Sequence, residues 1–86
     1  MDIKIEVKLF GILRRYRPEA AGGAPHHPFF VMMASGATVE MLLQTLEMPD
    51  DMVNATAVNR ESVEQPYTTP LQDGDQVSFF PPTAGG

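Results

Sequence analysis

Cysteine is absent from the 86-residue sequence, and no uninterrupted apolar run approaches the length of a membrane span. Without cysteine the chain cannot form disulfides, use a thiolate nucleophile or bind zinc through sulfur. A membrane-spanning helix needs about 20 consecutive apolar residues. A signal peptide needs a continuous apolar segment, whereas this sequence opens with alternating charged and apolar residues. We therefore expect a cytoplasmic protein that has no contact with a membrane.

Basic residues are scarce, with six Lys and Arg against eleven Asp and Glu, for a net charge of −5. Residues 1–39 carry five basic and three acidic side chains, whereas residues 40–86 carry one basic and eight acidic side chains. Binding to a nucleic acid backbone requires a basic face, so we expect no nucleic acid partner. The acidic half either steers a basic protein partner into contact or serves only as a solvated surface.

Two strands are predicted in the first half of the chain. Apolar and charged residues alternate over residues 2–10, which is typical of a strand with one buried face. A single helical turn is expected over residues 12–17. Three prolines and two glycines make residues 18–28 a loop. A second strand follows over residues 29–33, and because it is apolar on both faces, one face is either covered or available to a partner.

One main helix is predicted after this strand. Thr38 is the expected N-cap, and Pro49 should end the helix by the preceding one or two residues. The apolar residues at helical spacing form one stripe, which we assign to the core because no other helix is predicted to cover the sheet. That stripe consists of Val39, Leu42, Leu43 and Leu46.

Short strands complete the predicted fold. Residues 56–58 and 76–80 read as strands, residues 62–64 as a short extension, and residues 71–75 as a tight turn. A single helix on one face of a mixed sheet is an α+β arrangement. With a closing strand beside the first strand, we expect a β-grasp, or ubiquitin-like, roll of four to five strands spanning residues 1–80.

Residues 81–86 are predicted to be a flexible C-terminal tail. Pro81 and Pro82 end the last strand, because proline has no N–H to donate, and they favour an extended polyproline conformation. Glycine lacks a Cβ atom, so an enzyme can close tightly around a backbone that ends in two glycines. The predicted reactive group is the terminal carboxylate of Gly86. The residues expected to enter an active site with it are Thr83, Ala84 and Gly85.

Nothing in this chain is expected to catalyse a reaction at that carboxylate. The sequence has no phosphate-binding loop with the required lysine, and it offers no matched nucleophile and base. A carboxylate becomes reactive when ATP converts it into an acyl-adenylate. We therefore expect no bound cofactor and no metal, with ATP used by a separate activating enzyme.

The sequence from Asp73 to Gly86, DGDQVSFFPPTAGG, resembles the C-terminus of the MoaD/ThiS sulfur-carrier family, and most closely that of the MoaD type. Residues 7–11 (VKLFG), the helix entry at Thr38 and the Val58–Asn59 pair are also similar to that family. The similarity spans the chain and is densest at its two ends. The segment between the helix and Val58 is shorter than in many MoaD proteins, and the 18–28 loop is unusual.

This resemblance implies a β-grasp fold and a role in sulfur transfer. A ubiquitin-activating-like adenylyltransferase would adenylate Gly86, and the product would become a thiocarboxylate. The tail would then deliver sulfur to a second enzyme, such as the large subunit of molybdopterin synthase, in molybdenum cofactor biosynthesis. The resemblance assigns partner docking to Phe80, Pro81 and Pro82.

Several alternatives remain open at this stage. The sulfur acceptor is either a pterin precursor, the thiazole of thiamin or another metabolite; a protein modifier joined to lysines and a plain binding module are further possibilities. Phe80 either forms an exposed apolar patch with Phe30 or Met32, for partner binding, or lies buried under residues 66–70. Adjacent His26 and His27 are expected to be loop residues, because their side chains diverge and no matching ligand lies nearby.

Overall fold

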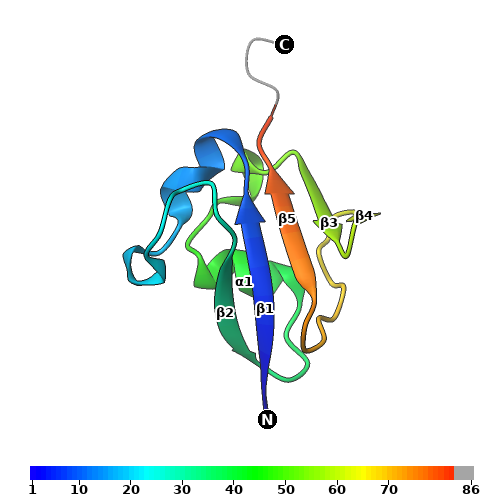
Figure 1. The fold of residues 1–86 in the computed structure, drawn as a ribbon. Helices are drawn as coiled ribbons and strands as arrows, with labels where there is room; N and C mark the ends of the chain where they lie inside the picture. The colour runs from blue at the N-terminus through cyan, green and yellow to red at the C-terminus, as the bar shows by residue number, and fades with distance from the viewer. Residues whose placement is uncertain (83–86) are drawn as a thin grey trace.

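The computed structural model describes residues 1–82, which fold into one mixed sheet with one α-helix packed against it (Figure 1). Five strands form the sheet, in the order β2-β1-β5-β3-β4. The mixed sheet, the single main helix and the β-grasp topology confirm the predicted fold. The elements are β1 (Asp2–Leu9), β2 (Phe29–Ala34), α1 (Val39–Thr45), β3 (Ala55–Val58), β4 (Glu61–Val63) and β5 (Gln76–Phe80).

The closing strand β5 lies in the middle of the sheet. It pairs in parallel with β1, with Leu9 opposite Phe79, and antiparallel with β3, with Ala55 opposite Phe80. Strand β1 pairs antiparallel with β2 on its other side. Because β1 and β5 run in the same direction, their C-terminal ends lie at the same end of the sheet, where the chain leaves after Phe80 (Figure 1).

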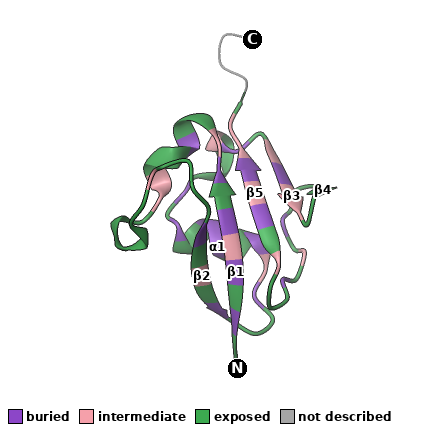
Figure 2. Ribbon diagram, in the orientation of Figure 1, coloured by how far each residue is buried: buried purple, intermediate pink, exposed green. Residues whose placement is uncertain are grey.

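The core lies between the inner face of the sheet and α1, and buried residues alternate with exposed ones along β1 (Figure 2). The alternation follows from the period of two in a strand, which sends successive side chains to opposite faces. Each fully buried aliphatic or aromatic side chain contributes about 1.5–3 kcal/mol by leaving water. The largest of them are Phe79, Ile5, Leu9, Leu13, Leu42 and Leu43.

Helix α1 begins where the sequence predicted and ends earlier. The side-chain oxygen of Thr38 accepts a hydrogen bond of 3.4 Å from the Met41 N–H, which confirms the N-cap. The helix ends at Thr45, well before Pro49. Glu47 adopts a left-handed backbone, and the Met48 N–H donates back to the Leu43 carbonyl while the Met48 side chain is buried. This local turn, and not the proline, therefore terminates the helix.

The connection from β1 to β2 contains two 3₁₀ helices, η1 (Gly11–Tyr16) and η2 (Glu19–Ala21). The first replaces the single helical turn predicted over residues 12–17 and buries Leu13 in the core. The Arg17 guanidinium donates hydrogen bonds to the carbonyl oxygens of Gly22 and His27. The Arg17 side chain thus links two parts of a mostly exposed loop.

The segment 66–70 packs against the start of α1. The carbonyl oxygens of Tyr67 and Thr69 accept hydrogen bonds from the N–H groups of Glu40 and Val39, at 3.0 and 3.2 Å. These bonds satisfy first-turn donors that a helix cannot satisfy by itself. Tyr67 is buried at this position. The segment therefore belongs to the helix side of the molecule and does not cover Phe80.

Candidate functional site at the tail exit

The end of β5 is held on both sides by backbone hydrogen bonds. The Phe10 N–H donates to the Phe79 carbonyl oxygen at 3.2 Å, and the Asn54 N–H donates to the Phe80 carbonyl oxygen at 2.8 Å. These bonds come from the segments after β1 and before β3, so the last two residues of β5 are held from both sides. Pro81 is therefore the first residue beyond the sheet, as the sequence predicted.

Phe80 stacks on Phe10 at this exit. The two ring centroids are 4.6 Å apart and the ring planes differ by 15°. Both residues are partly exposed, so Phe80 is neither fully open nor buried under residues 66–70. Stacked aromatic pairs contribute about 0.5–1.5 kcal/mol beyond the area they bury. The pair is thus a fixed apolar platform beside the tail.

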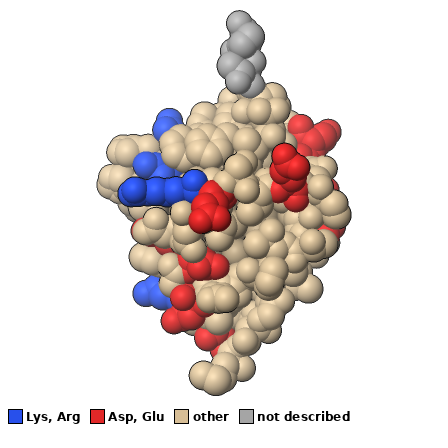
Figure 3. All heavy atoms as spheres, turned by 90° about the vertical axis from the view of Figure 1, so that its right-hand side faces the viewer, with Lys and Arg blue, Asp and Glu red and all other residues tan. Residues whose placement is uncertain are grey.

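An apolar groove with a volume of about 430 Å³ surrounds this platform, and we call it the exit groove. Ile12, which is 52% exposed, contributes a large apolar side chain to it. On the face that Figure 3 shows, the surface at the end of β5 is formed mainly by uncharged residues. The exit groove is lined by Phe10, Gly11, Ile12, Asn54, Phe80, Pro81 and Pro82.

Phe30 and Met32 lie elsewhere on the open face of the sheet. Phe30 is opposite Glu6, which is itself opposite Gln76 at the start of β5. Phe30 is therefore level with the beginning of β5, whereas Phe80 is at its end. The alternative in which Phe80 shares a patch with Phe30 or Met32 does not fit this register. Phe30 and Met32 are 58% and 60% exposed. The Lys4 ammonium lies 4.3 Å from the Phe30 ring centroid, a cation–π contact.

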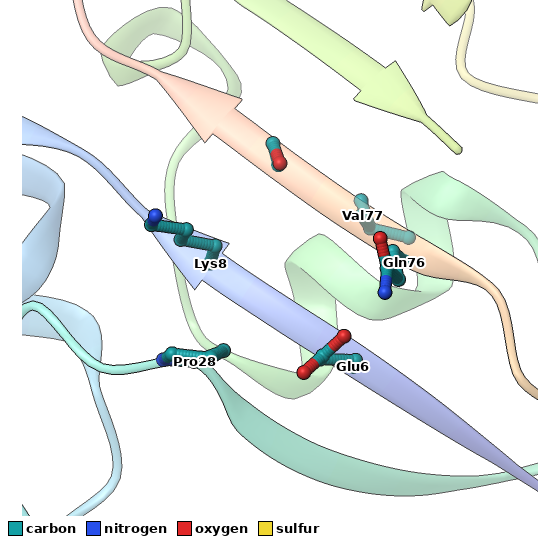
Figure 4. Close-up of a pocket in the computed structure, with 6 residues that line it drawn as sticks. Glu6, Lys8, Pro28, Gln76 and Val77 are labelled. Carbon is teal, nitrogen blue, oxygen red and sulfur yellow. The ribbon is translucent and has the colours of Figure 1, made fainter. Parts of the chain in front are cut away.

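A smaller hollow lies on the same open face, between β1, β5 and the residue before β2 (Figure 4). Its volume is about 90 Å³, well below the roughly 300–1,000 Å³ of typical ligand pockets. Lys8 and Glu6 bring opposite charges to it, and Gln76 adds a neutral amide. Its size and lining do not support a bound small-molecule substrate.

The described residues hold no group of three or more His, Cys, Asp or Glu side chains able to bind a metal ion. His26 and His27 are exposed in the loop, and their ring centroids are 4.5 Å apart in an edge-to-face arrangement. None of the helices over residues 1–82 has the length and apolar character required to cross a bilayer.

The structure brings together three of the predicted partner-binding residues, Phe80, Pro81 and Pro82, in the exit groove. The predicted tail residues Thr83, Ala84, Gly85 and Gly86 lie outside the described residues. Four further residues of the exit groove were not predicted from the sequence, namely Phe10, Gly11, Ile12 and Asn54. Parallel pairing of the first and last strands would have indicated these residues, because it places the residues that follow both strands at the same end of the sheet.

Comparisons with known proteins agree with this arrangement. The ThiS family model matches residues 7–86. The solution structure of the HVO 2177 protein from Haloferax volcanii is similar in fold, with a TM-score of 0.72 and 24% identity over 99% of this chain and 88% of that one. No curated protein matches the sequence.

Two further similar structures are named as subunits of molybdopterin-converting factors. A putative molybdopterin converting factor subunit 1 from Pyrococcus furiosus is 25% identical over 94% of this chain and 99% of its own, with a TM-score of 0.66. A complex of subunits 1 and 2 of the molybdopterin-converting factor from Helicobacter pylori contains a chain that is 27% identical. That alignment covers 98% of this chain and all of that one, with a TM-score of 0.60.

Proposed function

The chain belongs to the ThiS family, and we propose that it is a MoaD-type sulfur carrier whose Gly86 carboxylate is converted into a thiocarboxylate. In this proposal the protein is the substrate of an activating enzyme and the donor subunit for a sulfur-accepting enzyme. The single observation that carries it is the exit groove: a central strand fixed on both sides ends beside an apolar platform and directs Pro81 and Pro82 outward.

The proposed chemistry takes place on other proteins. A Gly86 carboxylate oxygen attacks the α-phosphorus of ATP on the activating enzyme, and pyrophosphate leaves. A hydrosulfide-level sulfur nucleophile then attacks the carbonyl carbon, so that a C–S bond forms while the C–O bond to AMP breaks. In this proposal the reacting carbonyl group lies at the end of two residues without side chains, Gly85 and Gly86, so that enzyme walls can close around the backbone.

A second subunit is proposed as the acceptor. The Helicobacter pylori protein is in complex with subunit 2 of its molybdopterin-converting factor, which supports a similar pairing here. The exit groove offers apolar, well-packed aromatic residues of the kind that anchor protein interfaces. We therefore place the partner on this groove, with the tail entering the partner's active site. Phe30 is proposed as an outlying contact on the same open face of the sheet.

The proposed function is tested by mass spectrometry. The full chain is incubated with a MoaD/ThiS-type adenylyltransferase, ATP and sodium sulfide. We expect a mass gain equal to replacement of one oxygen by one sulfur, located on the C-terminal peptide. A variant that lacks Gly86 should fold normally by circular dichroism and gain no sulfur. An unchanged mass with an enzyme that modifies its own carrier would refute the proposal.

The acceptor is tested separately with the thiocarboxylated protein. We expect sulfur transfer to a pyranopterin precursor when a molybdopterin synthase large subunit is added. Transfer with a thiazole synthase instead would assign the carrier to thiamin biosynthesis. Attachment of the chain through Gly86 to lysines of other proteins, detected as a Gly-Gly remnant after proteolysis, would show a protein modifier and contradict the proposed role as donor.

A further inference from the structure

Gly11 lies directly beneath the first residue of the tail. A Cβ atom built on Gly11 would be 2.9 Å from Cγ of Pro81, which is closer than real Cβ atoms approach other atoms, and 3.7 Å from Cδ, an ordinary van der Waals distance. The Pro81 ring therefore rests on the Gly11 backbone in space that any other residue would fill. Gly11 also has a φ of +56°, a left-handed conformation that glycine adopts without cost.

The surrounding contacts make this arrangement specific. The N–H of Phe10, the residue before Gly11, bonds to Phe79, and the Phe10 ring stacks on Phe80. The chain on both sides of the contact is thus fixed: β1 leads into Gly11, and β5 leads into Pro81. Gly11 is the first residue of η1, and its left-handed backbone turns the rest of that helix away, which leaves the Gly11 backbone open to the proline ring.

We propose that Gly11 is a positioning residue that sets the direction in which the tail leaves the domain. With the Phe80 carbonyl bonded to Asn54 and the Pro81 ring seated on Gly11, the tail starts from a fixed residue and does not pivot at Phe80. A fixed starting direction reduces the conformational freedom lost when the tail enters an active site. This role rests on the proposed function, because it concerns the delivery of Gly86 to another enzyme.

The proposal predicts that substitution of Gly11 changes binding to the activating enzyme, measured as KM, more than the chemical step, measured as kcat. Substitution of Gly11 displaces Pro81 and redirects the tail, but it leaves the reacting carboxylate unchanged. Gly11→Ala should therefore raise the KM of the activating enzyme for this protein by about tenfold, with kcat changed less than about twofold. A merely structural loss would instead lower the amount of folded protein and leave the KM of the folded fraction unaltered.

Gly36→Ala is the matched control. Gly36 also has a positive φ, of +91°, but nothing lies within 4 Å of a Cβ built on it, and it follows β2 at the opposite end of the sheet. Both alanine variants thus carry backbone strain, and only Gly11→Ala meets Pro81. We expect Gly36→Ala to reduce the melting temperature without changing KM.

Pro81→Ala completes a double-mutant cycle, because it removes the Cγ and Cδ atoms that Gly11 approaches. In the Pro81→Ala background, Gly11→Ala should change KM by less than about twofold. If Gly11→Ala raised KM equally in the wild-type and Pro81→Ala proteins, the contact would be irrelevant and the proposal would be overturned. An unchanged KM for Gly11→Ala alone would also overturn it. If Gly11→Ala fails to fold, Pro81→Ala with the wild-type KM overturns it as well.

NMR gives a readout that does not depend on the proposed function. The full-length protein should show a nuclear Overhauser effect between the Gly11 Hα and Pro81 Hγ protons, retained in Gly36→Ala and lost in Gly11→Ala. Its absence from the wild-type spectrum would overturn the positioning role even where sulfur is gained normally. Its presence in a protein that is never adenylated would instead refute the proposed function and leave the contact in place.

Discussion

Thr56 gives a prediction in which removal of a polar group stabilises the protein. It lies on the inner face of β3, opposite Phe79 and Val63, and is only 1% exposed. Its side-chain hydroxyl has no hydrogen-bond partner within residues 1–82. A hydroxyl that is buried without a partner loses its hydrogen bonds to water and gains none on folding.

The magnitude follows from the two terms that Thr56→Val changes. Removal of the unsatisfied hydroxyl recovers about 1–3 kcal/mol, and the new methyl group adds up to about 0.8 kcal/mol of burial where it fits. Packing adjustments offset part of this gain, so we expect about 1–2 kcal/mol. For a domain of this size the melting temperature should rise by about 4–16 °C.

Urea unfolding and thermal unfolding, both followed by circular dichroism, provide the assay. Thr45→Val is the matched control, because the exposed Thr45 hydroxyl donates to the Met41 carbonyl oxygen at 2.9 Å. That change should be neutral or slightly destabilising. A lower melting temperature for Thr56→Val than for wild type would refute the reasoning and show that the hydroxyl contributes to folding.

Two further predictions concern the surface. Phe80→Ala should weaken binding of the proposed acceptor subunit by about 10–100-fold, because Phe80 is part of the fixed aromatic platform, whereas Phe30→Ala should weaken it by about threefold. Isothermal titration calorimetry that ranked the two variants in the opposite order would place the interface on β2. Arg17→Met should increase amide hydrogen exchange over residues 22–28, because two carbonyl contacts are lost, with a change in unfolding free energy below about 1 kcal/mol. Unchanged exchange in this loop would mean that Arg17 does not hold it.

The parts of the fold that depend on local pattern could be predicted from the sequence. The alternation of apolar and charged residues predicted which side chains of β1 face the core, and the predicted N-cap at Thr38 is confirmed. The end of α1 was not predicted correctly, because Glu47 takes a left-handed backbone that no local residue preference signals. Proline at position 49 is a visible helix breaker, but the helix already ends at Thr45, and the turn at Glu47 follows before the proline.

The site was only half predictable for a related reason. Phe80, Pro81 and Pro82 could be identified because they follow one another in the chain. Their partners Phe10 and Gly11 are about 70 residues away in sequence, and only the parallel pairing of β1 with β5 brings them together. The separation of Phe30 from Phe80 likewise depends on register, which alternation alone does not give.

The central position of β5 suits the proposed function, because β5 is the strand that carries the tail. In the proposed function, a tail bound by another enzyme would transmit force to the strand that carries it. An edge strand such as β2 or β4 is hydrogen-bonded on one side only, whereas β5 is bonded to β1 and β3 along its length and buries Val77 and Phe79. Separation of β5 would break both ladders and open the core at once. Binding of the tail to another enzyme would therefore leave β5 paired and the domain folded.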